Sequence, residues 1–201
     1  MLTFTDRDVI LVNQDTRRLH WSNPRSGTYA AQLVFTPPLP KAPTLSFRRG
    51  WASIDGKFRG RPFHFVTTHL ETSGFATIQQ AQAVEFLAGP AFGRGADLVA
   101  GDFNSAADGS STPTYGLLTA QLRDAWSVRG RARGYTCCQE PTLTDPKRQF
   151  DERIDLILVH GAKPLAARRV GTRPIATTPP RWASDHAGVV ADVRLAKKRL
   201  S

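Results

Sequence analysis

Residues 98–104 read Leu-Val-Ala-Gly-Asp-Phe-Asn, a short apolar run that ends in two polar side chains. The apolar part predicts a buried strand, and Gly101 permits another backbone to approach closely. Because residues two apart on an extended segment point to the same side, Asp102 and Asn104 should face one pocket while Phe103 turns into the core. A carboxylate and an amide side by side can hold and orient a water molecule. An isolated Asp-x-Asn is more commonly a simple Asx turn.

Polar groups also interrupt or close other apolar runs of the chain. His69 closes a strand-like run, Asp155 lies inside the most apolar run, and Asp185 and His186 precede the last one. A charge beside a buried strand costs several kcal/mol unless it is paired, hydrogen-bonded or holding a metal. Asp155 could accept a ring hydrogen of His186 and so fix the imidazole. A satisfied core histidine with a capping Asp is the better explanation of an isolated Asp-His pair, but here the other elements occur in the same chain.

The rest of the chain predicts one domain of mixed α and β structure. Alternating apolar residues indicate half-buried strands, and apolar residues three and four apart indicate helices. Proline and glycine clusters mark the loops. Strands are expected over 8–12, 27–35, 51–58, 62–70, 97–100, 154–159 and 188–195, a hairpin turn at 58–61, helices over 77–87 and from Pro113 onward, and irregular structure over 123–135.

Composition restricts the class of protein. A chain of 201 residues with 40% hydrophobic content is long enough for one domain with a packed core. The 27 Lys and Arg against 17 Asp and Glu give a net charge of +10 and a pI near 10.4, so the surface should attract polyanions such as nucleic acid or anionic lipid. No apolar run approaches the ~20 residues of a membrane-spanning helix, and the first residues lack a signal-peptide layout, so the sequence as given predicts a soluble protein.

The only two cysteines, Cys137 and Cys138, are adjacent. Neighbouring Cα atoms lie about 3.8 Å apart, whereas a disulfide prefers roughly 5.5 Å, which argues against a disulfide scaffold. No second Cys or His pair follows at zinc-like spacing, so the sequence favours a packing role over a structural metal.

Four segments in chain order resemble the endonuclease/exonuclease/phosphatase superfamily, which includes deoxyribonuclease I, abasic-site endonucleases, sphingomyelinases and inositol-phosphate phosphatases. They are Val-Thr-Thr-His-Leu-Glu at 66–71, Gly-Asp-Phe-Asn at 101–104, Arg-Ile-Asp-Leu-Ile-Leu at 153–158 and Ser-Asp-His at 184–186. The resemblance implies an α+β fold, a four-layer αββα sandwich of two central mixed sheets flanked by helices, with the site at one end of the strands. It also implies attack of water on a phosphoester assisted by Mg²⁺, with Mn²⁺ as a substitute.

The resemblance also implies roles for individual residues. Asp102 would orient or deprotonate the water, and Asn104 would position the water and the phosphate. His186, supported by Asp155, would stabilise the charged phosphoryl oxygens. The remaining implied roles are a second phosphate contact at His69 and metal ligands at Asp185 and Asp102.

The sequence departs from the family upstream of His69. Family members begin with a strand bearing a catalytic Asn and continue to a Gln-Glu segment whose Glu is the principal metal ligand, and nothing in residues 1–48 resembles these. We therefore expect one domain over residues 1–201 that lacks its N-terminal part, through truncation or a misassigned start. Asp6 or Asp8 could help to hold His69. An uncovered sheet edge would favour association with another chain.

The predicted function is metal-dependent hydrolysis of phosphodiester or phosphomonoester bonds, with activity reduced by the missing Glu ligand. The substrate would be nuclease-like or phospholipase-like, and the positive charge places nucleic acid ahead of phospholipid. The alternative is a catalytically impaired fragment that binds nucleic acid or a partner protein electrostatically. Related chains with a Tyr-Thr-Cys-Cys segment like residues 135–138 are often exported, so the sequence does not assign a compartment.

Overall fold

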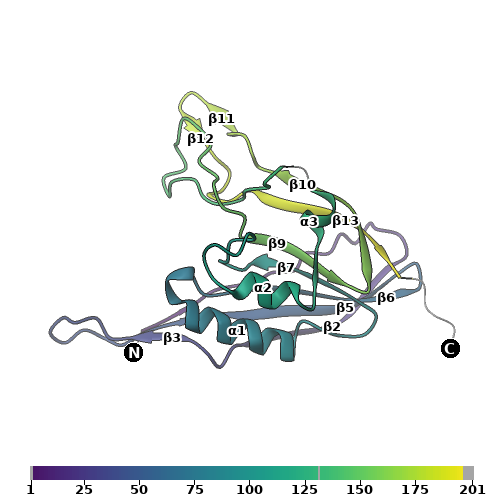
Figure 1. Ribbon diagram of the computed structural model, residues 1–201, viewed down its shortest axis with the longest axis horizontal. Helices are drawn as coiled ribbons and strands as arrows, with labels where there is room; N and C mark the ends of the chain where they lie inside the picture. Colours follow the sequence, from purple (N-terminus) through teal and green to yellow (C-terminus); the bar gives the residue numbers. More distant parts are fainter. Residues whose placement is uncertain (1, 131, 197–201) are drawn as a thin grey trace.

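The computed structural model describes residues 2–130 and 132–196 of the chain. Its centre is a six-stranded mixed sheet (Figure 1). In spatial order its strands are β2 (Leu19–Thr28), β5 (Gly50–Phe58), β6 (Arg61–His69), β7 (Ala96–Asp102), β9 (Asp155–His160) and β8 (Arg123–Asp124). Strands β6 and β7 are parallel, and the other neighbours in this sheet are antiparallel.

Helix α1 (Ala76–Ala88) and helix α2 (Thr114–Thr119) contribute to the main core on one face of this sheet. Val66 of β6 and Val99 of β7 are register partners, and both are fully buried on that face. Phe86 of α1 packs edge-to-face on Phe103, with ring centroids 6.3 Å apart. Phe103 therefore enters the core, as predicted from its place between Asp102 and Asn104.

The opposite face of the sheet carries a second, two-stranded antiparallel sheet of β10 (Ala162–Val170) and β13 (Gly188–Leu195) (Figure 1). The short helix α3 (Ala125–Arg129) packs against β10 and β9. The predicted α+β sandwich is therefore confirmed. Asp124 begins α3 as its cap, because its carboxylate accepts a hydrogen bond from the Trp126 backbone N–H at 2.8 Å.

A separate three-stranded sheet forms an arm beside the main sheet (Figure 1). The aromatic ring of Phe47 stacks between those of Phe4 and Phe35, and Phe4 is half exposed. The strands of the arm are β1 (Leu2–Thr5), β4 (Leu45–Arg48) and β3 (Leu33–Phe35), and the remaining elements are a 3-10 turn (Ser73–Phe75), β11 (Ala176–Thr177) and β12 (Pro180–Arg181).

Strong local signals predicted the central elements correctly. The turn at 58–61 joins β5 to β6, and both Arg59 (φ 51°) and Gly60 (φ 77°) have the positive φ that a two-residue hairpin turn requires. The strands expected over 51–58, 62–70, 97–100, 154–159 and 188–195 and both helices are present with shifts of one or two residues at most of their ends.

Three expectations were wrong. No strand forms over 8–12, because β1 ends at Thr5 and the following apolar residues lie beside Ala52 and Ile54 on the sheet face instead of pairing. The strand expected over 27–35 is interrupted, because Tyr29 turns inward to bond Thr68 at 2.6 Å. The region 123–135 is not wholly irregular, since it contains β8 and α3.

The long strand β2 lies at the edge of the six-stranded sheet, and in the described part of the chain it pairs with β5 alone. This is the kind of edge that favours pairing with another chain, so association through it remains a prediction. No helix among residues 2–130 and 132–196 is long and apolar enough to cross a membrane.

Candidate active site

The sheet register brings the first three site residues together. His69 and Asp102 are the last residues of the parallel strands β6 and β7, so they end at the same edge as register partners. Asp155, the first residue of antiparallel β9, is the register partner of Asp102 on its other side. Residues on one level of a sheet point to the same face, and here that face is the one opposite α1. The three strand ends therefore form one row of polar groups.

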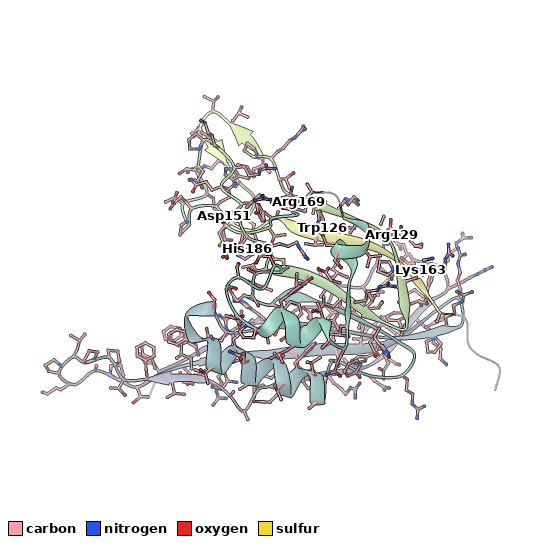
Figure 2. The ribbon with its side chains drawn as sticks, viewed as in Figure 1. Trp126, Arg129, Asp151, Lys163, Arg169 and His186 are labelled. Atoms are coloured by element: carbon pink, nitrogen blue, oxygen red, sulfur yellow. A yellow bond between two sulfur atoms is a disulfide. The ribbon has the colours of Figure 1, made fainter. Side chains whose placement is uncertain are left out.

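His186 reaches this row from the segment that precedes β13, and Figure 2 shows it close to the start of β9. Its Nδ1 donates a hydrogen bond to Asp155 Oδ2 at 2.8 Å, and both side chains are about one quarter exposed. This bond, reinforced by the nearby acidic charges, raises the pKa of His186 to about 9. Since Nδ1 is engaged, Nε2 is the ring nitrogen available for a substrate.

Asp102 is partly buried, with its side chain 17% exposed, between polar neighbours. Burial, followed by the charge of Asp155, raises the pKa of Asp102 to about 7. Its Oδ1 accepts a hydrogen bond from the Asn104 backbone N–H at 2.8 Å, so the Asx turn that competes with a functional interpretation is present. The turn and the site coexist, because ligand atoms of Asp102, Asp155 and His186 lie within 4.8 Å of one another.

Asn104 joins Asp102 to His69. Its backbone adopts a positive φ of 48°, which turns the chain back after β7. The Asn104 amide donates to the Leu70 carbonyl at 2.9 Å and lies 3.1 Å from His69 Nε2. His69 Nε2 also lies 3.4 Å from Asp102 Oδ2. Asn104 is therefore fixed by its neighbours in the orientation it presents to the site.

On its other side His69 contacts two charged groups. Asp6 Oδ2 lies 2.5 Å and Arg49 Nη1 lies 2.8 Å from His69 Nδ1. Burial and the Arg49 charge lower the pKa of His69. The expectation that Asp6 helps to hold His69 agrees with this contact, whereas Asp8 makes no hydrogen bond to the ring in the part of the chain that the structure describes.

Arg49 is a site residue that the sequence analysis missed. It lies between Asp6, at 2.6 Å, and Glu71, at 3.7 Å, with its side chain mostly buried. Arg49 directly precedes β5, which pairs with β6 so that Trp51 stands opposite Thr68. Counting back from the hairpin turn would have placed Arg49 near His69, and this is the signal that could have found it.

Asp185 does not join the cluster as closely as expected. Its side chain is exposed and accepts a 3.3 Å hydrogen bond from the Ser184 hydroxyl. Among the described residues, the group of close ligand atoms contains Asp102, Asp155 and His186 but not Asp185. The structure therefore brings five of the six predicted residues into mutual contact and leaves Asp185 at the rim, where its metal role remains a prediction.

The two cysteines lie beside this cluster. The Cys137–Cys138 peptide bond is cis, the Cα atoms are 3.1 Å apart and the sulfur atoms are bonded to each other. The expectation that these neighbouring cysteines do not bridge was wrong, since the structure joins their sulfur atoms. Cys138 Sγ lies 3.6 Å from His186 Nε2.

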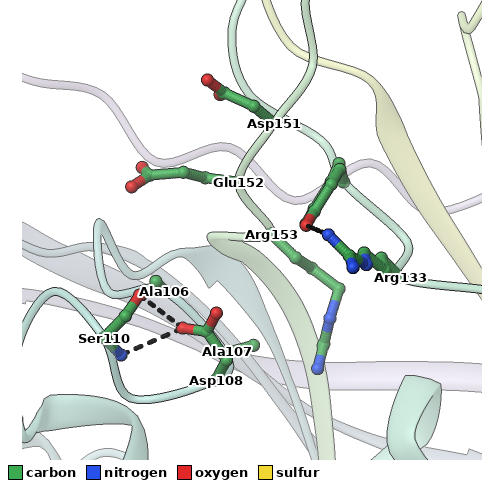
Figure 3. A pocket seen from close by; sticks show the side chains of 9 residues that line it. Ala106, Ala107, Asp108, Ser110, Arg133, Asp151, Glu152 and Arg153 are labelled. Carbon is green, nitrogen blue, oxygen red and sulfur yellow. Dashed lines mark hydrogen bonds between the residues drawn. The ribbon is translucent and has the colours of Figure 1, made fainter.

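A hollow of about 640 Å³ is lined by residues 106–108, 110, 133, 135 and 151–153 (Figure 3). None of these residues belongs to the cluster, but Glu152 and Arg153 closely precede Asp155 in the chain. The Arg133 guanidinium donates to the Tyr135 hydroxyl at 2.9 Å on its wall. Its lining therefore combines cationic, aromatic and acidic groups, with Asp108, Asp151 and Glu152 as the acids.

The lack of a side chain at Gly101 lets β6 and β7 approach closely next to Asp102. A Cβ added at Gly101 would lie 2.0 Å from the Thr68 carbonyl oxygen, so β6 and β7 could not keep their present spacing. We expect Gly101→Ala to lower the free energy of unfolding by about 1–3 kcal/mol, measured by urea denaturation. Gly116→Ala is the matched control, because an added Cβ there meets no atom within 4 Å. Equal stability of the two variants would refute this close-packing role.

Comparisons with known proteins agree with this geometry. The model of the Endonuclease/Exonuclease/phosphatase family matches residues 6–186. No curated protein matches the chain. An endonuclease/exonuclease/phosphatase family protein from Bacteroides thetaiotaomicron has a similar structure, with a TM-score of 0.67 and 17% identity over 92% of this chain and 66% of that one.

Two further solved structures are similar. The mannosyl-6-phosphatase of Bacteroides thetaiotaomicron has a TM-score of 0.62 and 19% identity over 90% of this chain and 68% of that one. D. rerio TDP2, complexed with a single-strand DNA product, has a TM-score of 0.58 and 17% identity over 88% and 69%. The chain thus spans about two thirds of the length of these relatives. At such identities the structures show the fold, and the family match shows the membership: the chain belongs to the endonuclease/exonuclease/phosphatase family.

Proposed function

We propose that this chain is a metal-dependent hydrolase of phosphoester bonds. The observation that carries the proposal is the Asp155–His186 pair, whose atoms lie within 4.8 Å of the Asp102 carboxylate at the meeting point of three strands. A carboxylate can take a proton from the attacking water, and a neighbouring imidazolium can stabilise the negative charge of the phosphoryl oxygens. Together they suit attack of water on a phosphoryl group.

The roles follow from the hydrogen bonds. Asp102 Oδ1 accepts the Asn104 backbone N–H, and its Oδ2, 3.4 Å from His69 Nε2, would take a proton from a water molecule. His186 presents Nε2, whose N–H group would donate a hydrogen bond to a phosphoryl oxygen while Asp155 holds the ring. Asn104 and His69, fixed by each other, would position the phosphate from the opposite side.

The donor set suits a hard divalent cation. Asp102 and Asp155 are register partners whose charges repel, as the raised pKa of Asp102 shows, and a cation would relieve that repulsion. Mg²⁺ prefers oxygen ligands and accepts one or two carboxylates completed by water and substrate phosphate. We propose Asp102 as the principal protein ligand and Asp185 as a second, with Mn²⁺ as a substitute. The bound ion would supply Lewis-acid stabilisation of the phosphoryl charge.

A polyanionic substrate is the proposed class, with nucleic acid placed first. The net charge of +10 favours polyanions, and one similar structure holds a single-strand DNA product. The hollow lined by residues just before Asp155 in the chain would offer Arg133 and the Tyr135 ring to the part of the substrate beyond the phosphate. Its acidic wall would suit the hydroxyl groups of a sugar, and another similar structure is a mannosyl-6-phosphatase.

The decisive experiment is hydrolysis of bis(p-nitrophenyl) phosphate, p-nitrophenyl phosphate and single-stranded DNA with Mg²⁺, Mn²⁺ or EDTA. We expect activity with either ion and its loss in EDTA. Activity that EDTA leaves unchanged would exclude the metal-dependent mechanism. Absence of hydrolysis together with salt-dependent DNA binding would instead support the electrostatic binding fragment, which the charge of +10 favours.

The pKa shifts predict a bell-shaped pH profile. Asp102 must lose its proton to hold the cation and to act as a base, so kcat/KM at subsaturating Mg²⁺ should rise as the pH passes about 7. His186 must keep its proton, so kcat/KM should fall again as the pH passes about 9. The profile is measured with a p-nitrophenyl substrate read at a pH-independent wavelength. A rate that keeps rising well above pH 9 would contradict the role of the His186 cation.

A further inference from the structure

The cysteine loop is held firmly against the candidate active site. The Thr136 hydroxyl accepts hydrogen bonds from the backbone N–H groups of Ile154 and Asp155, both at 3.3 Å. The Thr136 carbonyl accepts a 2.8 Å bond from the Ala187 N–H, next to His186. The loop is thus tied to both members of the Asp155–His186 pair, and this fixes where the following two sulfur atoms lie.

These sulfur atoms and His186 form a compact donor set. Ligand atoms of Cys137, Cys138 and His186 lie within 4.8 Å of one another, although His186 is 48 residues from Cys138. Two thiolates and an imidazole are the ligands of thiophilic ions such as Zn²⁺, whereas Mg²⁺ prefers oxygen. The sequence argued against a structural metal because no further Cys or His pair follows the two cysteines at zinc-like spacing. The fold supplies a third ligand, His186, from a distant segment of the chain.

The imidazole is oriented for such a role. Asp155 engages Nδ1 at 2.8 Å, so Nε2 is the free nitrogen, and Nε2 is the atom that faces Cys138 Sγ at 3.6 Å. A carboxylate on one ring nitrogen and a metal on the other is the usual arrangement of metal-binding histidines. The same Nε2 is the atom proposed to contact the phosphoryl group.

We propose that Cys137, Cys138 and His186 form a second cation site, specific for thiophilic ions such as Zn²⁺, which opens when the bond between the two cysteines is reduced. A phosphine reductant breaks the S–S bond, each sulfur takes one proton, and the phosphorus is oxidised to a phosphine oxide with oxygen from water. Zn²⁺ then binds both sulfur atoms and His186 Nε2, with release of the two thiol protons and the proton on Nε2. The ion and a phosphoester cannot share Nε2, so Zn²⁺ excludes the substrate. This last consequence rests on the proposed function, whereas the ion site does not.

Co²⁺ tests the site by spectroscopy, independently of hydrolysis. The chain is reduced with a phosphine, freed of excess reagent without air and titrated with Co²⁺. We expect a thiolate-to-Co²⁺ charge-transfer band in the near ultraviolet that oxidised protein lacks and that Zn²⁺ displaces. The band should disappear in the Cys137→Ser/Cys138→Ser variant and after alkylation of reduced wild-type protein, which needs no variant to fold. It should change shape in His186→Gln and stay unchanged in His160→Gln, since His160 pairs with Asp97 at the other end of β7.

No band in reduced wild-type protein, or a band that survives alkylation, would overturn the proposed site. Inhibition is tested separately with bis(p-nitrophenyl) phosphate and Mg²⁺. Zn²⁺ should lower hydrolysis at least tenfold in reduced wild-type protein, with recovery after a chelator and fresh Mg²⁺, but not in the double serine variant. Equal inhibition of both proteins would overturn the competition at Nε2. A chain without hydrolase activity would refute the proposed function while the Co²⁺ band still decides the site.

Discussion

His186→Ala is expected to lower kcat/KM for phosphodiester hydrolysis by about 10²–10³-fold, the usual contribution of one positioned donor to the charge of the transition state. The substitution removes the imidazole that bonds Asp155 through Nδ1 and presents Nε2 to the proposed phosphoryl position. It also leaves Asp155 without its 2.8 Å partner, so its charge acts unopposed on Asp102. Steady-state kinetics with bis(p-nitrophenyl) phosphate and Mg²⁺ measure the effect.

His160→Ala is the matched control for this loss. His160 also pairs with an aspartate of a central strand, through a 3.0 Å contact to Asp97, but it is 60% exposed and lies at the far end of β7. We expect His160→Ala to retain kcat/KM within about twofold, because exposed ion pairs contribute little. Comparable losses in both variants would mean that any broken His–Asp pair disturbs the protein, and His186 would lose its proposed role.

The sequence predicts most of the main sheet because its signals are local. The alternation over 51–58 and 62–70 and the Arg59-Gly60 turn fix the β5–β6 register without reference to the rest of the chain. Polar residues at the ends of apolar strands likewise indicate a common site, since strand ends that meet at one edge bring their side chains together. His69, Asp102 and Asp155 meet for this reason, and Asn104 and His186 reach them from the segments after β7 and before β13.

What the sequence could not predict depends on distant contacts. Strand β10 contains Lys163, Arg168 and Arg169 and has little apolar alternation, so only its pairing with β13 makes it a strand. The contact of Cys138 with His186 spans 48 residues and depends on how the loop before β9 folds back. Arg49 lies outside every motif, and its role becomes visible through its neighbours Asp6 and His69.

Asp102→Asn should reduce hydrolysis by about 10²–10⁴-fold while it stabilises the metal-free fold. The amide keeps the shape of the side chain and can still accept the Asn104 N–H bond, so the turn after β7 should persist. Because it cannot take a proton from water or carry the charge that holds a cation, both proposed roles of Asp102 are lost. Kinetics with Mg²⁺ and denaturation in EDTA measure the two effects.

The direction of the stability change follows from the raised pKa of Asp102. Burial and Asp155 favour the protonated carboxyl in the folded state, so its contribution to stability is complete below pH 3.8 and is lost as the pH rises through about 7. Each pKa unit corresponds to about 1.4 kcal/mol, so at pH 8 in EDTA the asparagine variant should unfold at higher urea concentration than wild-type protein.

Asp97→Asn on the same strand is the contrasting control. Asp97 is buried, accepts a 2.8 Å bond from the Gly93 N–H and pairs with His160, so its neutralisation should lower stability and leave the catalytic residues in place. A protein that keeps a carboxylate where it destabilises the fold must gain something else from that charge. If Asp102→Asn destabilised the fold at pH 8 as Asp97→Asn does, Asp102 would be a structural residue and the proposed base and metal ligand would have to be sought elsewhere.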